Sequence, residues 1–145
     1  MPRPVHFEIH ASDPEAIRAF YESVFGWSFQ RWGDNPYWIV ITGDGDPMAG
    51  TPHTQPGIDG GMLPRQGDAP SDGQPVNSFV ITLDVPDCDA YVDRVTSAGG
   101  SVALAAQDMP GVGRVAYVKD PDGNLFGLFQ PEPSAEASAE SSTDA

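Results

Sequence analysis

The chain has 145 residues and a formal net charge of −14, from 21 acidic residues against 7 lysines and arginines. This length fits one domain that can bury a core, and the charge disfavours binding to nucleic acid or to anionic membranes. No apolar run reaches the about 18 residues of a membrane span, and no apolar leader precedes the first strand, so we expect a cytoplasmic protein. The single cysteine, Cys88, excludes an internal disulfide and a cysteine-based zinc site.

The charge balance is also unusual in kind, because Lys119 is the only lysine. The acidic tail 132–145 carries four of the negative charges, which leaves −10 on residues 1–131. An acidic, lysine-poor surface is typical of proteins from salt-accumulating halophiles, in which concentrated salt screens the repulsion between carboxylates. We therefore expect a halophilic protein.

The first predicted element is a strand at residues 5–10. Its alternation places two apolar side chains on one face and three polar ones on the other: Phe7 and Ile9 against His6, Glu8 and His10. We expect the apolar pair to face a helix and the polar trio to face a cavity.

A helix follows, and its start and stop signals are clear. Ser12 is the expected N-cap, because Pro14 falls in the first turn and Glu15 lies three residues after the cap. Gly26 ends the helix. Its apolar stripe has helical spacing and should cover the strand: Ile17, Phe20, Tyr21 and Val24.

The remaining elements alternate with turn-forming segments. Three more strands are expected in the first unit, at 27–32, 37–42 and 58–64, with an exposed loop at 43–56 and a linker at 65–76. The second unit should contain a strand at 78–84, a helix that begins at Asp87 and ends at Gly99, and strands at 102–107, 112–119 and 124–130.

The two units repeat one another. A shift of 72 residues aligns Phe7 with Phe79, Ile9 with Ile81 and Pro14 with Pro86. A repeat of this size indicates two copies of one supersecondary unit. We predict an α+β fold of two βαβββ modules, 4–64 and 77–131, that form a curved mixed sheet with the helices on its outer face. The acidic tail 132–145 lacks apolar periodicity and should be disordered.

Two motifs give the pattern a family resemblance. Residues 6–27 read HFEIHASDPEAIRAFYESVFGW, and residues 117–130 read YVKDPDGNLFGLFQ. Together with the repeat, these motifs resemble the vicinal oxygen chelate superfamily of glyoxalases, bleomycin-resistance proteins and extradiol dioxygenases over residues 4–131. The resemblance implies a homodimer with a small organic ligand in the concave cavity.

The resemblance also implies where a metal would lie. Metal-dependent members place one His or Glu ligand on the first strand and one on the last strand of each module. The matching positions here are His6, Gly61, Ser78 and Gly127. Glycine has no donor side chain and serine is a poor ligand for a divalent transition metal. We therefore expect that the usual metal site is absent and that the protein needs no cofactor.

An unorthodox metal site is the alternative. His6, Glu8 and His10 share one face, but alternate residues on a strand are about 6.6–7 Å apart, so all three could hardly bind one ion. His53 would contribute only if its loop folded inward. At Gly61 and Gly127, the missing side chains leave room that an organic ligand or a neighbouring aromatic ring could fill.

The sequence supports more than one function. A metal-independent small-molecule binding protein of the glyoxalase/bleomycin-resistance-like type fits the missing ligands best. The alternatives are a metal-dependent lyase, isomerase or dioxygenase, and a metal-free acid–base enzyme that uses His6 and Glu8; whether any reaction is catalysed stays open. The residues expected to contact the ligand are His6, Glu8, Trp38, Gly61, Ser78 and Gly127.

Overall fold

The structure, a computed structural model, describes residues 1 and 3–133. The predicted disordered tail lies outside the described residues except for Glu132 and Pro133. The first module contains β1 (Phe7–Ala11), α1 (Pro14–Phe25), β2 (Ser28–Arg31), β3 (Trp38–Ile41), a short helix η1 (Pro47–Ala49) and β4 (Gly60–Pro64). The second contains β5 (Thr82–Asp84), α2 (Cys88–Ser97), β6 (Ser101–Met109), β7 (Gly113–Lys119) and β8 (Leu125–Pro131).

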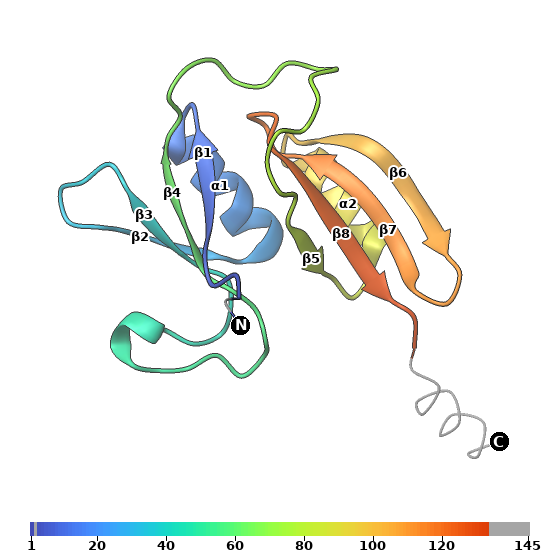
Figure 1. The fold of residues 1–145 in the computed structure, drawn as a ribbon, viewed down its shortest axis with the longest axis horizontal. Helices are drawn as coiled ribbons and strands as arrows, with labels where there is room; N and C mark the ends of the chain where they lie inside the picture. The colour runs from blue at the N-terminus through green and yellow to red at the C-terminus, as the bar shows by residue number, and fades with distance from the viewer. Residues whose placement is uncertain (2, 134–145) are drawn as a thin grey trace.

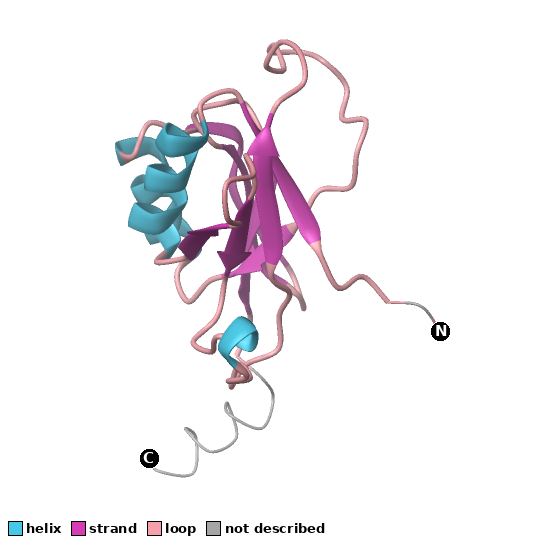
Figure 2. Cartoon of the chain, turned by 90° about the vertical axis from the view of Figure 1, so that its left-hand side faces the viewer, coloured by secondary structure: helices cyan, strands magenta, loops and turns pink. Residues whose placement is uncertain are grey.

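Each module forms its own four-stranded mixed sheet, with order β1-β4-β3-β2 in the first and β5-β8-β7-β6 in the second. The first strand of each module pairs in parallel with the last, and the other pairs are antiparallel. The sheets lie beside one another (Figure 1), and α1 and α2 cover the same side of both (Figure 2). This architecture confirms the predicted α+β fold of two βαβββ modules.

The core lies between the helices and the sheets. The predicted stripe of α1 is buried, and Ile9 packs beneath it while Glu8 and His10 on the other face of β1 are exposed. Burying one such aliphatic or aromatic side chain contributes about 1.5–3 kcal/mol, so this stripe accounts for a large part of the stability of the module. No helix in the described part of the chain is long and apolar enough to cross a membrane.

The N-cap of α1 is Asp13, not the predicted Ser12. The Asp13 carboxylate accepts a hydrogen bond from the Ala16 amide at 3.3 Å. Proline favours the first helical position, so Pro14 at that position makes the residue before it the cap. The Ser12 amide instead donates to the carboxylate of Asp122 in the second module, at 2.9 Å.

The repeat in the structure is shifted by two residues from the repeat predicted from the sequence. The helix caps Asp13 and Asp87 are equivalent, so the shift is 74 residues and not 72. The sequence alignment matched two prolines with different roles, because Pro14 follows its cap and Pro86 precedes one. As a result β5 begins at Thr82, and Phe79 is fully exposed instead of facing α2.

The two-residue offset preserves the faces of the strand, since side chains alternate with a period of two. Ile81 and Leu83 therefore pack against the core, and Thr82 lies on the opposite face.

The turn between β7 and β8 joins the two modules. Asp120 is 2% exposed, and its carboxylate accepts a hydrogen bond from the Tyr21 hydroxyl of α1 at 3.0 Å. Arg65, directly after β4, donates to Asp122 at 2.9 Å and to the His10 carbonyl at 2.8 Å. Because a buried carboxylate is costly without donors, these bonds fix the modules relative to each other and so define the space between them.

Candidate functional site

Three polar side chains meet on the face of the first sheet opposite α1. His6 lies just before β1, Glu8 lies on β1, and Tyr37 lies just before β3. The Tyr37 hydroxyl is 2.9 Å from His6 Nε2 and donates to Glu8 Oε2 at 3.4 Å. We call these residues the His6 cluster. The side chains of His6 and Glu8 are about half exposed, so a ligand can reach them.

The Tyr37 ring occupies the space above Gly61. Gly61 is the β4 residue that pairs with Glu8, and a Cβ atom at Gly61 would overlap the Tyr37 hydroxyl. The glycine therefore makes room for the tyrosine. Burial, followed by the neighbouring Glu8 carboxylate, raises the pKa of Tyr37 above its ordinary value, so the hydroxyl remains a hydrogen-bond donor at neutral pH.

The second module repeats this arrangement with a smaller side chain. Gly127 on β8 pairs with Thr82 on β5, as Gly61 pairs with Glu8. A Cβ atom at Gly127 would lie 2.7 Å from the Thr82 hydroxyl oxygen. Both last-strand positions are thus covered by a hydroxyl-bearing neighbour. The sequence left open whether a ligand or an aromatic ring fills the room at Gly61, and the structure places an aromatic ring there.

These residues do not fit the metal of the metal-dependent relatives. The 74-residue shift makes Val80 the equivalent of His6 in place of Ser78, so the four positions offer one donor, the His6 imidazole. Among residues 1 and 3–133, no three His, Cys, Asp or Glu side chains are placed to share a metal ion. His53 is engaged elsewhere, with its Nε2 atom 2.7 Å from an Asp59 oxygen and its Nδ1 atom accepting from the Gly45 amide at 2.8 Å.

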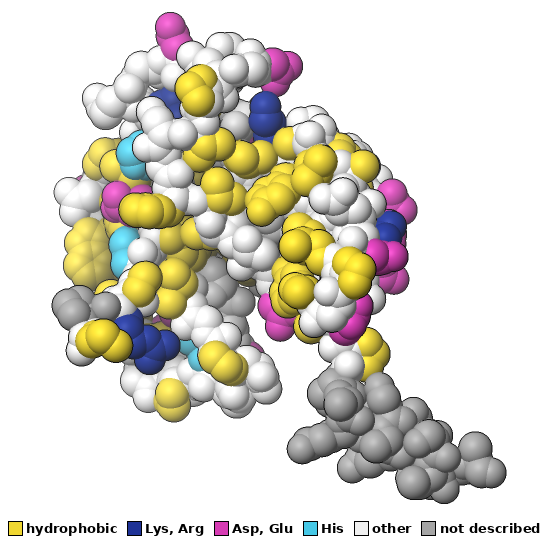
Figure 3. Space-filling view, turned by 45° about the vertical axis from the view of Figure 1, so that its right-hand side comes forward, with side chains coloured by type: hydrophobic (Ala, Val, Ile, Leu, Met, Phe, Trp, Pro, Cys, Tyr) yellow, Lys and Arg dark blue, Asp and Glu magenta, His cyan; other side chains and the backbone are white. Residues whose placement is uncertain are grey.

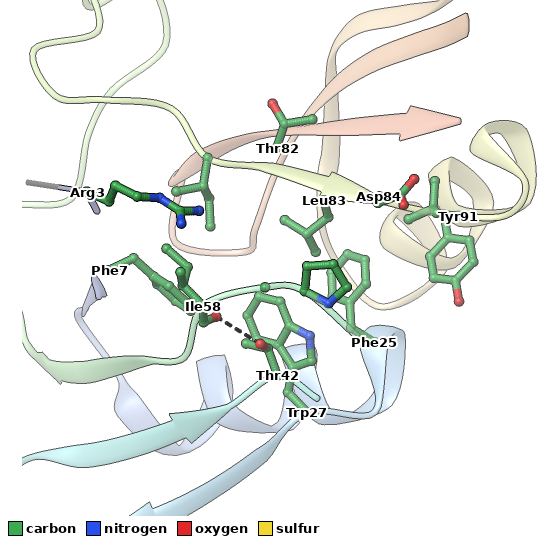
Figure 4. A pocket seen from close by; sticks show the side chains of 14 residues that line it. Arg3, Phe7, Phe25, Trp27, Thr42, Ile58, Thr82, Leu83, Asp84 and Tyr91 are labelled. Carbon is green, nitrogen blue, oxygen red and sulfur yellow. Dashed lines mark hydrogen bonds between the residues drawn. The ribbon is translucent and has the colours of Figure 1, made fainter. Parts of the chain in front are cut away.

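A cleft of about 630 Å³ lies between the two modules (Figure 4). Its walls are mainly apolar and aromatic, and they come from the start of the first module, the loop before β4, strand β5 and helix α2. Thr82 belongs both to this cleft and to the cover of Gly127. The aromatic side chains in the walls are Phe7, Phe25, Trp27 and Tyr91.

The other predicted ligand contacts are placed differently. Trp38 is 7% exposed and packs in the hydrophobic core, on the same face of the sheet as its partner Met62. The expectation that Trp38 faces the cavity is therefore wrong, and its neighbour Tyr37 faces that side. Strand alternation places Tyr37 and Trp38 on opposite faces of the sheet, but it does not tell which of the two points toward the cavity.

Ser78 lies in the segment before β5. Together with Glu8 and His10 it lines a second hollow of about 710 Å³, between the linker and the sheets. The charged residues in this hollow are largely engaged, since Arg65 binds Asp122 and Lys119 binds Asp72. We therefore take the cleft as the candidate site. None of the six residues expected to contact the ligand lines this cleft, and Glu8 and Ser78 line the second hollow instead.

Comparisons with known proteins agree with this architecture. The family model of the glyoxalase/bleomycin resistance protein/dioxygenase superfamily matches residues 3–128. A protein of Mycobacterium tuberculosis that carries the name glyoxylase CFP32 is 31% identical to this chain over 133 residues. The match covers 88% of this chain and 45% of that protein. The chain thus spans about half the length of this relative.

Two solved structures share the fold. TnmS3, an antibiotic binding protein from Streptomyces sp. CB03234, has a TM-score of 0.57 and 24% identity, with 91% of this chain and 98% of that chain covered. The fosfomycin resistance protein FosX of Listeria monocytogenes, solved with Mn(II) and a dihydroxypropylphosphonic acid, has a TM-score of 0.63 and 17% identity, with 89% and 90% covered.

Proposed function

Because the chain belongs to the glyoxalase/bleomycin resistance protein/dioxygenase superfamily, we propose that it binds a small organic molecule in the cleft between its modules, without a metal ion. One observation carries this proposal. At Gly61 and Gly127, where metal-dependent relatives would place ligands, the space is taken by the side chains of Tyr37 and Thr82. A catalytic zinc site typically needs about three protein ligands, and this chain offers one.

The chemistry of the cleft supports an organic ligand. Pockets for such ligands typically measure about 300–1,000 Å³ and combine apolar and aromatic walls with a few polar groups. A cleft of about 630 Å³ with four aromatic side chains has this character. TnmS3, which shares the fold, is named as an antibiotic binding protein, so the fold is compatible with binding of an organic molecule.

A fluorescence titration tests the proposal. The neutral probe phenylnaphthylamine is added to the protein in the presence of a metal chelator, and we expect saturable binding. Ile58→Asp, which puts a charge into the cleft wall, should weaken binding at least tenfold. Met48→Asp adds the same charge at a position that is 57% exposed on η1 and should leave binding unchanged. Equal effects of the two substitutions, or binding that requires an added metal, would contradict the proposal.

A second candidate function, metal-free acid–base catalysis, is favoured by the geometry of the His6 cluster. With Tyr37 donating to Glu8, His6 can donate through Nε2–H to the Tyr37 oxygen, which leaves Nδ1 to take a proton from a ligand. General acid–base groups contribute about 10²- to 10⁴-fold to a rate. This function therefore requires a substrate whose turnover falls at least about a hundredfold in both His6→Ala and Tyr37→Phe. Loss of binding alone would count against it.

We also propose a homodimer, on the evidence of β6. This strand is the edge of the second sheet and nearly all of its nine residues are exposed, Val102, Leu104 and Met109 among them. Hydrophobic side chains gather on the face turned forward in Figure 3. An exposed apolar edge strand readily pairs with another chain, and a second copy of this chain would cover it.

For the cellular setting we propose the cytoplasm of a salt-accumulating organism. The support is the net charge of −14 and the single lysine. At molar salt the Debye length is about 3 Å, so the repulsion among surface carboxylates is largely screened.

A further inference from the structure

We infer that the cleft selects flat aromatic ligands that carry an anionic group, and that Arg3 is the residue that recognises the anion. This inference rests on the proposed binding function and adds the chemical class of the ligand. Arg3 and the aromatic walls lie in the same cleft, with Arg3 at one end and Asp84 and Tyr91 at the other (Figure 4).

The aromatic wall of the cleft is continuous across the two modules. Trp27 lies 5.9 Å from Phe7 and 5.5 Å from Phe25, measured between ring centroids. Phe25 in turn stacks on Tyr91 of α2 at 5.8 Å. Such a row of rings favours a planar ligand, because aromatic contacts contribute about 0.5–1.5 kcal/mol each beyond the area that they bury.

Arg3 is the exception among the basic residues. Six of the seven basic side chains contact a carboxylate or lie over an aromatic ring: Arg18, Arg31, Arg65, Arg94, Arg114 and Lys119. Within the described residues, Arg3 has neither kind of partner. In a chain with three acidic residues for each basic one, a guanidinium without a carboxylate partner at the mouth of an aromatic cleft is suited to an anion from outside.

Asp84 makes the two ends of the cleft opposite in charge. It lies on β5 at the end opposite Arg3, so an anionic group is attracted at one end and repelled at the other. The net charge of the protein also opposes an anionic ligand. At physiological salt, however, charges more than about 8 Å away are largely screened, so the local attraction by Arg3 outweighs the distant carboxylates once the ligand is bound.

A pair of matched probes tests the inference. Anilinonaphthalene sulfonate and phenylnaphthylamine share one ring system and differ in the sulfonate. We expect the sulfonate to bind wild-type protein about two- to fivefold more tightly than the neutral probe at moderate salt, which is the size of effect for one exposed charged contact. Arg3→Gln should abolish this difference, because it weakens binding of the sulfonate far more than binding of the neutral probe. Arg31→Gln, which removes the same charge on β2, should change neither affinity.

The outcomes separate the two proposals. If the neutral probe binds in the cleft but Arg3→Gln leaves the preference for the sulfonate intact, or if no preference exists, the inference about anions is wrong and the proposed binding function stands. If neither probe binds in a way that Ile58→Asp abolishes, the proposed function fails and the inference falls with it. A preference that Arg3→Gln removes, and that weakens as salt is raised, supports the inference.

Discussion

Replacing Gly61 with alanine should force Tyr37 out of its position. The new Cβ atom would overlap the Tyr37 hydroxyl, and the ring would have to leave the bond to His6, which is 2.9 Å long. Overpacking costs about 1–3 kcal/mol, while Gly→Ala by itself stabilises by about 0.4–1 kcal/mol through the unfolded chain. Tyr37 is partly exposed and can swing outward, so we expect an overpacking cost of about 1.5–2 kcal/mol and a net loss of about 1 kcal/mol.

The sign of the effect should reverse when the tyrosine is absent. In a Tyr37→Ala background there is no hydroxyl to displace, and Gly61→Ala should stabilise the protein by about 0.4–1 kcal/mol. The difference between the two backgrounds is the coupling energy of a double-mutant cycle, here about 1.5–2 kcal/mol. Urea denaturation of the four proteins at constant salt measures it.

Gly60→Ala is the matched control. A Cβ atom at Gly60 would lie 2.5 Å from the Phe7 carbonyl oxygen, a backbone atom that cannot swing aside. This substitution should therefore destabilise the protein equally with and without Tyr37. If Gly61→Ala also has the same effect in both backgrounds, Tyr37 does not occupy the Gly61 position and the account of that position is refuted.

Three further predictions concern stability and assembly. Tyr21→Phe should destabilise the protein by about 1–3 kcal/mol at pH 7 and by less near pH 4, because the lost bond is to the ionised Asp120 carboxylate; equal losses at both pH values in urea denaturation would contradict this. Burial raises the pKa of Asp120 above its unfolded value. The protonated Asp120 side chain therefore stabilises the fold below about pH 4, and this stabilisation is lost as the pH rises through the folded-state pKa. Tyr21→Phe should make that loss of stability steeper, because it removes a donor to the ionised carboxylate. The melting temperature should rise steeply from low to molar salt, and a flat response would rule out a halophilic protein. Leu104→Lys on β6 should convert a dimer to a monomer in sedimentation, and an unchanged mass would exclude β6 as the interface.

The fold could be predicted from the sequence because its signals are local. The alternation around Phe7 and Ile9, the stripe on α1 and the glycine that ends it depend on residues near one another in the chain. The wrong shift of 72 residues between the modules also came from local sequence similarity. Pro14 and Pro86 align in the sequence, but Pro14 follows its capping aspartate and Pro86 precedes one. The caps of the two helices, which the structure shows, therefore determine the true equivalence of the strands.

The candidate site was harder to predict because it depends on contacts between distant segments. The equivalence of Gly61 and Gly127 was predicted correctly and is confirmed by the pairing of their strands. Which side chain fills the space above each glycine depends on the register of β3 and β5, and this register is set by pairing across the sheet. For the same reason the sequence does not distinguish Tyr37 from Trp38 as the residue that faces away from the core. The role of Arg3 could not be seen until the partners of the other basic residues were known.

The most direct test of the central claim is the metal content of the protein, purified in high salt without tags or chelators and measured by mass spectrometry. Because side chains fill the positions at which relatives bind metal, we expect far less than one equivalent of zinc, iron, nickel or manganese per chain. A stoichiometric metal that is lost in His6→Ala would contradict the account, because His6 is the one donor that remains at those positions.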